Sequence, residues 1–272
     1  MGSRGAGEQG SRGDGEHSNL SASSSSSASS PLSPSSPLPT QDSAVLSAIV
    51  LAGGKSSRMG RDKALIPIQG VPLLELVCGI AESCAETVYI VTPWPERYEH
   101  LLLPHCQFIK EVSLPVADKK LEIQQNTENS LIYHAPLLPC SPAPPHPRTP
   151  APNTHGPLVG FAQGLAQVQT DWVLLLACDL PRLRVEVLQA WAAGLDNVND
   201  EAIAALAAHP KGWEPLCGFY RRRCLPQLLE FINQGGRSFQ QWLKQYPIEV
   251  LPLPAPEMLF NCNTPEDWAL MR

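Results

Sequence analysis

Four short apolar runs alternate with helical patterns along the chain, and this alternation limits the possible folds more than any other feature. The runs span residues 47–51, 87–92, 172–177 and 203–208. An unbroken apolar run of strand length is typical of a strand that is covered on both faces. The segments between the runs, at 71–85, 158–168 and 185–195, carry apolar residues at helical spacing. We therefore predict an α/β domain of three layers, with helices on both faces of a doubly wound, mostly parallel sheet.

Two adjacent glycines, Gly53 and Gly54, follow the first predicted strand, and Lys55, Arg58 and Lys63 come soon after. Glycine lets the backbone turn sharply and approach a ligand closely. Backbone N–H groups flanked by basic side chains can cradle phosphates. Neither the P-loop spacing nor the G-x-G-x-x-G spacing fits the glycines here. The segment therefore indicates a nucleotide-phosphate site of another kind, with an ordinary glycine-rich turn as the alternative.

Asp179 directly follows the strongly apolar run 172–177. A carboxylate at that position suits magnesium, which takes one or two carboxylates together with phosphate oxygens. An N-cap for the helix after Pro181 is the alternative interpretation. Ligands of doubly wound sheets bind beyond the carboxyl ends of the strands. We therefore expect Gly53 and Asp179 to meet in one cleft.

The segment from Leu51 to Lys63 reads L-A-G-G-K-S-S-R-M-G-R-D-K. It resembles the signature of nucleotidyltransferases with a Rossmann-like sheet, in the close form that molybdenum cofactor guanylyltransferases carry. The segments C-D-L-P at 178–181, G-P-L-V-G at 156–160 and N-C-N-T-P-E-D at 261–267 resemble the same family. The resemblance covers about 46–267 apart from a proline-rich insertion. It implies an enzyme that transfers GMP from GTP to molybdenum–molybdopterin and releases pyrophosphate.

The resemblance also assigns roles to individual residues of this chain. Lys63, Arg58 and Asp179 would be catalytic, and Asp179 and Asn263 would bind Mg²⁺ as the cofactor. The nucleotide would contact Leu51, Ala52, Gly53, Gly54, Lys63, Glu111 and Asp179. The acceptor molybdenum–molybdopterin would contact Gly156, Gly160, Arg237 and Asn261.

Three adjacent arginines, Arg221, Arg222 and Arg223, have a different interpretation. We expect them to form a solvated helix start, because adjacent residues cannot share one helix face.

Base recognition is where the sequence departs from the family pattern. Relatives often have an asparagine after the second strand, whereas this chain has Thr92 and Pro93. Glu111 could fill the family's acidic position after the third segment. Two alternatives to guanylyl transfer therefore stay open: a nucleotidyltransferase that uses CTP or another phosphate acceptor, and an adaptor that binds and delivers molybdenum cofactor.

Two segments have low-complexity compositions. Residues 1–43 are rich in serine and proline and contain few large apolar residues, so we predict a disordered extension before a nucleotidyltransferase domain at 44–272. Prolines also crowd residues 135–155, and we predict a proline-rich insertion at about 114–155.

Charge and cysteine content bear on partners and compartment. The net charge of −6 gives no sign of nucleic-acid binding, and no apolar run reaches membrane-spanning length. None of the eight cysteines forms a C-x-x-C pair, so we expect reduced thiols in a cytoplasmic protein. We expect a monomer whose partners are its two substrates, with molybdenum-cofactor insertion proteins or apo-molybdoenzymes as further candidates.

Overall fold

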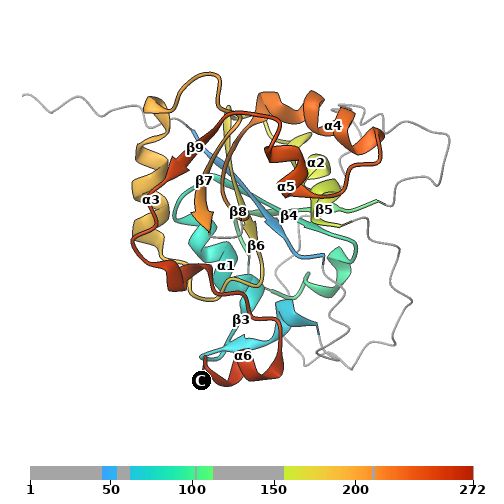
Figure 1. Ribbon diagram of the computed structural model, residues 1–272. Helices are drawn as coiled ribbons and strands as arrows, with labels where there is room; N and C mark the ends of the chain where they lie inside the picture. Colours follow the sequence, from blue (N-terminus) through green and yellow to red (C-terminus); the bar gives the residue numbers. More distant parts are fainter. Residues whose placement is uncertain (1–44, 54–61, 102, 113–155, 210–211, 272) are drawn as a thin grey trace, which may run out of the picture. The chain divides into compact units, whose positions relative to one another are not determined.

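Six of the seven strands in the main sheet run in one direction. The computed structural model describes residues 45–53, 62–101, 103–112, 156–209 and 212–271 (Figure 1). The strand order is β5-β4-β1-β6-β8-β7-β9, and only β8 is antiparallel to its neighbours in this described sheet. The strands are β1 (Ser47–Leu51), β4 (Thr87–Thr92), β5 (Cys106–Lys110), β6 (Trp172–Ala177), β7 (Ala204–His209), β8 (Gly212–Arg221) and β9 (Ile248–Leu251). The predicted doubly wound, mostly parallel sheet is confirmed.

Helices cover both faces of this sheet, which gives the three predicted layers (Figure 1). On one face, α1 (Leu73–Glu82) and α3 (Val185–Ala193) pack over alternate strand residues such as Val50 and Leu174. On the other face lie α2 (Pro157–Leu165), α4 (Leu225–Asn233) and α5 (Phe239–Leu243). No helix of the described residues combines the length and the apolar character needed to cross a membrane.

The element boundaries agree closely with the sequence pattern in the centre of the sheet. The strands β1, β4 and β6 have the predicted bounds, and β7 is shifted by one residue. The pattern at 71–85 predicted helix throughout, but its first two residues form β3 (Val71–Pro72), which pairs with β2 (Pro67–Ile68). The predicted extension at 1–43 and the predicted insertion at 114–155 lie outside the described residues.

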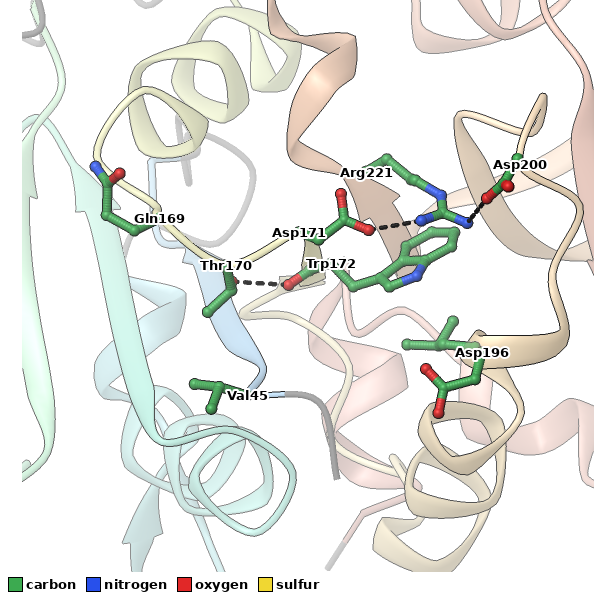
Figure 2. Close-up of a pocket in the computed structure, with 9 residues that line it drawn as sticks. Val45, Gln169, Thr170, Asp171, Trp172, Asp196, Asp200 and Arg221 are labelled. Carbon is green, nitrogen blue, oxygen red and sulfur yellow. Dashed lines mark hydrogen bonds and ion pairs between the residues drawn. The ribbon is translucent and has the colours of Figure 1, made fainter. Parts of the chain in front are cut away.

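The interpretation of Arg221 as a solvated helix start is wrong. Arg221 ends β8 and is only 8% exposed. Its guanidinium lies 4.3 Å from the ring centre of Trp172 and forms ion pairs with Asp171 at 2.5 Å and Asp200 at 3.3 Å (Figure 2). A buried arginine charge requires such partners. Here the pairing ties the start of β6 to the end of β8, so the role of Arg221 is structural.

A hollow of about 550 Å³ opens beside this ion-pair cluster, at the end of the sheet where β6 begins (Figure 2). It is lined by Val45, Gln169, Thr170, Asp171, Trp172, Leu195, Asp196, Asp200 and Arg221. None of the site residues predicted from the sequence lies in it. Although it is larger than the cleft described below, it is not where the predicted chemistry gathers.

The close approach of α2 to the sheet depends on Gly164. A Cβ at this position would lie 2.9 Å from a Val91 methyl and 3.1 Å from Ile49 atoms, all in the closed core. We expect Gly164→Ala to lower the free energy of unfolding by about 1–3 kcal/mol through overpacking. The matched control is Gly79→Ala on α1, where no atom lies within 4 Å of the new Cβ. That variant should gain about 0.5–1 kcal/mol from helix propensity. Urea unfolding of both variants would measure the difference, and equal effects would contradict the packing argument.

Candidate active site

The candidate site is a cleft where β1, β4 and β6 end together. Hydrogen bonds between strands continue past the ends of β1 and β6, from Ala52 N–H to the Val91 carbonyl (2.9 Å) and from Cys178 N–H to the Leu51 carbonyl (3.1 Å). The cleft encloses about 380 Å³. Its lining residues are Leu51, Ala52, Gly53, Asp62, Lys63, Ala64, Val91, Glu111, Gly156, Pro157, Gly160, Ala177, Cys178, Asp179 and Leu216. The structure thus brings together most of the predicted site residues.

Lys63 is the cation that the described residues place in this cleft. Its ammonium donates to the Asn263 Oδ1 atom at 2.7 Å and lies 4.0 Å from the Asp179 Oδ2 atom. Asp62 fixes the backbone beneath it, because its Oδ1 atom accepts from the Ala64 N–H and caps the 3₁₀ turn that Lys63 begins. The Asp62 Oδ2 atom also accepts from the buried Tyr98 hydroxyl at 2.9 Å. Asp62 therefore anchors the segment that carries Lys63.

The chain's C-terminal segment supplies Asn263. The Cys262 N–H donates to the Asp179 carbonyl at 3.0 Å, which holds the segment against the end of β6. The Asp267 carboxylate accepts from the Asn263 and Thr264 N–H groups, both at 2.8 Å, and Thr264 caps α6 (Pro265–Ala269). Thr264 therefore caps α6, while the preceding Asn263 lies near Lys63 together with Asp179.

Two oxygens of the kind that hard cations prefer face one point in the cleft. The Asp179 carboxylate and the Asn263 amide oxygen both lie within 4.0 Å of the Lys63 ammonium. Burial raises the pKa of Asp179 above its usual value, and the nearby Lys63 charge partly opposes that shift. A cation beside this carboxylate therefore relieves the cost of burying its charge. The oxygen donors and their convergence fit a magnesium ion.

Glu111 lies just beyond β5, and its carboxylate faces Gly53, two residues after β1. A Cβ on Gly53 would lie 2.7 Å from the Glu111 Oε2 atom, and a Cβ on Gly160 would lie 3.6 Å from it. The glycine at position 53 therefore leaves the room that this carboxylate occupies. Burial raises the pKa of Glu111 to about 7. A carboxylate of this kind is poised to accept hydrogen bonds from a ligand inside the cleft.

The N-terminus of α2 forms another wall of the cleft, with Gly156, Pro157 and Gly160 among the lining residues. Gly156 precedes the helix with a φ of 91°, a conformation that favours glycine. Pro157 occupies the first helical position, where its missing N–H costs nothing. The free N–H groups of the first turn suit an anionic group.

Some predicted site residues do not line the cleft. The Arg237 guanidinium donates to the carbonyls of Ile232 (2.8 Å) and Gly236 (2.6 Å), and the Asn261 amide donates to the Leu259 carbonyl at 3.4 Å. Gly54 and Arg58 lie outside the described residues. Sequence reasoning assigned no role to Asp62, which lines the cleft, although this residue belongs to the signature segment and could have been singled out there.

Comparison with known proteins identifies the family of this chain. The family model described as "MobA-like NTP transferase domain" matches residues 48–116 and 133–249. A probable molybdenum cofactor guanylyltransferase of Nostoc sp. is 62% identical over 227 residues, which cover 84% of this chain and 90% of that protein. A protein of the same name from Synechococcus elongatus is 38% identical over 226 residues, covering 83% of this chain and 97% of its own length.

Solved structures with low identity show the fold alone. Molybdopterin-guanine dinucleotide biosynthesis protein A of Archaeoglobus fulgidus superposes with a TM-score of 0.57 at 19% identity, covering 83% of this chain and 96% of its own. A cytidylyltransferase for 2-C-methyl-D-erythritol 4-phosphate from Thermus thermophilus gives 0.53 at 13% identity, covering 84% and 97%. The fold therefore serves more than one base, whereas the relatives at 62% and 38% identity both carry the name guanylyltransferase. The chain belongs to the MobA-like NTP transferases and, within them, to the molybdenum cofactor guanylyltransferases.

Proposed function

We propose that this protein transfers GMP from GTP to molybdenum–molybdopterin, giving the guanine dinucleotide form of the cofactor and pyrophosphate. In this reaction a phosphate oxygen of the acceptor forms a bond to the α-phosphorus of GTP, and the bond from that phosphorus to the leaving pyrophosphate breaks. The observation that carries the proposal is the meeting of Lys63, Asp179 and Asn263 beyond the carboxyl end of β6, where Lys63 and Asp179 line the cleft. The names of the relatives at 62% and 38% identity support the same substrates.

Asp179 and Asn263 would hold Mg²⁺, through a carboxylate and an amide oxygen. When bound, the ion supplies a Lewis acid and a template that offset phosphate charge. The ammonium of Lys63 would then move from its present partner Asn263 toward the triphosphate and stabilise charge on the departing pyrophosphate. Positioning and charge neutralisation are the main contributions that phosphoryl transfer asks of a protein.

Glu111 would select guanine. An ionised carboxylate can accept hydrogen bonds from both the N1–H and the 2-amino group of that base, whereas cytosine and adenine lack this pair of neighbouring donors. The carboxylate lies over Gly53, beside the backbone that would contact the nucleoside at Leu51 and Ala52. The N-terminus of α2 would receive the acceptor's phosphate at Gly156 and Gly160. Arg237 and Asn261 remain proposed acceptor contacts.

The test is pyrophosphate release with magnesium and molybdenum–molybdopterin, comparing GTP, CTP, ATP and UTP for the wild type and Glu111→Gln. We expect wild-type release with GTP, and we expect Glu111→Gln to lower the kcat/KM for GTP by about 10- to 100-fold, because a hydrogen bond to a charged group is lost. A preference for CTP would change the assigned product. Release with no nucleotide, from folded protein with active acceptor, would favour the adaptor instead.

The kcat/KM for GTP in the same experiment should depend on pH through Glu111. Burial raises the pKa of Glu111 to about 7, so the ionised, guanine-binding form gains population as the pH rises through that value. The wild-type kcat/KM for GTP should therefore rise between about pH 6 and pH 8, since this parameter reports on groups of the free enzyme. Glu111→Gln should lack that rise. A rise that persists in the variant would assign the titration to another group.

A further inference from the structure

The chain holds Glu111 in place through a side chain on another element. Gln163 lies on α2, is 6% exposed, and makes two hydrogen bonds to the backbone of Val112. Its Oε1 atom accepts from the Val112 N–H at 2.9 Å, and its Nε2 atom donates to the Val112 carbonyl at 2.8 Å. The amide thus pairs with Val112 as a neighbouring strand would.

This pairing occurs just beyond the end of β5, where the regular hydrogen bonds between β5 and β4 have ended. The register of β5 with β4 ends at Lys110, and one further bond joins the Glu111 N–H to the Thr92 carbonyl at 2.8 Å. The Val112 side chain is 58% exposed, so apolar packing does little to fix this residue. Among the contacts of the described residues, the two bonds from Gln163 are the ones that hold Val112, and through it they set the direction of the preceding Glu111.

Gln163 also connects Glu111 to α2, the helix that forms another wall of the cleft. It lies three residues after Gly160, on the same side of α2, and Gly160 faces the Glu111 carboxylate. A buried amide that satisfies both a donor and an acceptor is rigid, since leaving either group unpaired is costly. The same helix that would receive the acceptor thus fixes the carboxylate that would bind the base.

We propose that Gln163 is a positioning residue that sets base selectivity by holding Glu111 in the orientation that accepts both guanine donors. This inference rests on the proposed function. A positioning role differs from a purely structural role in one respect. The loss of Gln163 should change the choice between bases, and that change should depend on the presence of Glu111.

The test is the ratio of kcat/KM for GTP to that for ATP in wild type, Gln163→Met, Glu111→Gln and the double variant. Methionine has a similar length but makes neither hydrogen bond. We expect Gln163→Met to lower the ratio about tenfold or more, as for misaligned hydrogen bonds to a charged group. In the Glu111→Gln background the same change should alter the ratio less than about twofold, because both residues act through one contact.

The matched control is Gln189→Met on α3, on the opposite face of the sheet. It too removes a glutamine bond to a backbone carbonyl, that of Ser83 at 2.8 Å, and should leave the ratio unchanged. Both rates of a ratio come from one preparation, so partial unfolding cancels. If Gln163→Met yields no folded protein, Gln163→Glu, which replaces the amide donor with a carboxylate oxygen that repels the Val112 carbonyl, should lower the same ratio.

Two results would overturn the proposal while the proposed function stands: a wild-type ratio in Gln163→Met, or equal falls in both Glu111 backgrounds. Failure of the wild type to favour GTP over ATP would instead overturn the proposed function.

Discussion

Asp179→Ala should lower turnover by roughly 10³-fold or more, because a divalent cation that offsets phosphate charge supplies several kcal/mol of transition-state stabilisation. The Asp179 carboxylate lines the cleft and lies 4.0 Å from the Lys63 ammonium, beside the Lys63–Asn263 contact. Its charge is already costly, since burial raises its pKa. Removing it should therefore not destabilise the fold, and a thermal unfolding curve close to that of the wild type is expected.

The Asp179→Asn variant tests whether turnover depends on the negative charge of this side chain or only on its shape. It keeps an oxygen in the cleft but removes the negative charge, and it should lose nearly as much turnover as Asp179→Ala. Asp196→Asn is the matched control, because Asp196 is exposed and lines the hollow at the other end of the sheet. That variant should keep wild-type turnover. Wild-type rates in both Asp179 variants would remove this residue from the metal site.

Lys63→Ala should lower turnover by about 10²-fold or more, by analogy with the loss of one preorganised electrostatic donor. The Lys63 ammonium is held within the cleft by Asn263 and Asp179, and the turn that carries it is capped by Asp62. The charge is therefore already inside the cleft before substrate binds, and only the short movement of the ammonium from Asn263 to the triphosphate is needed during the reaction. The effect should fall mainly on kcat, because charge on the leaving pyrophosphate develops in the transition state.

Lys63→Arg tests whether charge alone suffices. Arginine keeps the charge but presents a planar fork in place of a point charge, so we expect only partial recovery of kcat. Lys244→Ala, at an exposed position beyond α5, should have no effect on turnover. A loss of less than twofold in Lys63→Ala would show that Lys63 does not act on the triphosphate.

Local sequence patterns gave good predictions for the centre of the molecule. The strands β1, β4 and β6 are buried on both faces, and an unbroken apolar run marks such strands whatever surrounds them. Edge strands gave no such signal: β5 and β9 are short and partly exposed, and their pairing depends on neighbours distant in sequence. The helix predicted from residue 71 began too early because Val71 and Pro72 pair with β2.

The arginine run shows the limit of such patterns most clearly. Nothing near Arg221 in the sequence indicates burial. Its partners Asp171, Trp172 and Asp200 lie between 21 and 50 residues away. Antiparallel pairing of β8 with β6 brings the first two to it, and antiparallel pairing of β8 with β7 brings Asp200. A local rule about adjacent residues on a helix could not anticipate that the first arginine ends a strand.

The sequence by itself determined the alternating elements, the glycine pair after β1, the carboxylate after β6 and the family signature, because each of these depends on residues close together in the chain. Only the tertiary structure decided that Lys63 meets Asn263, two hundred positions apart, and that Gln163 fixes the residue after Glu111. Those contacts follow from strand order and from hydrogen-bond partners on separate elements, and no local pattern encodes either of them.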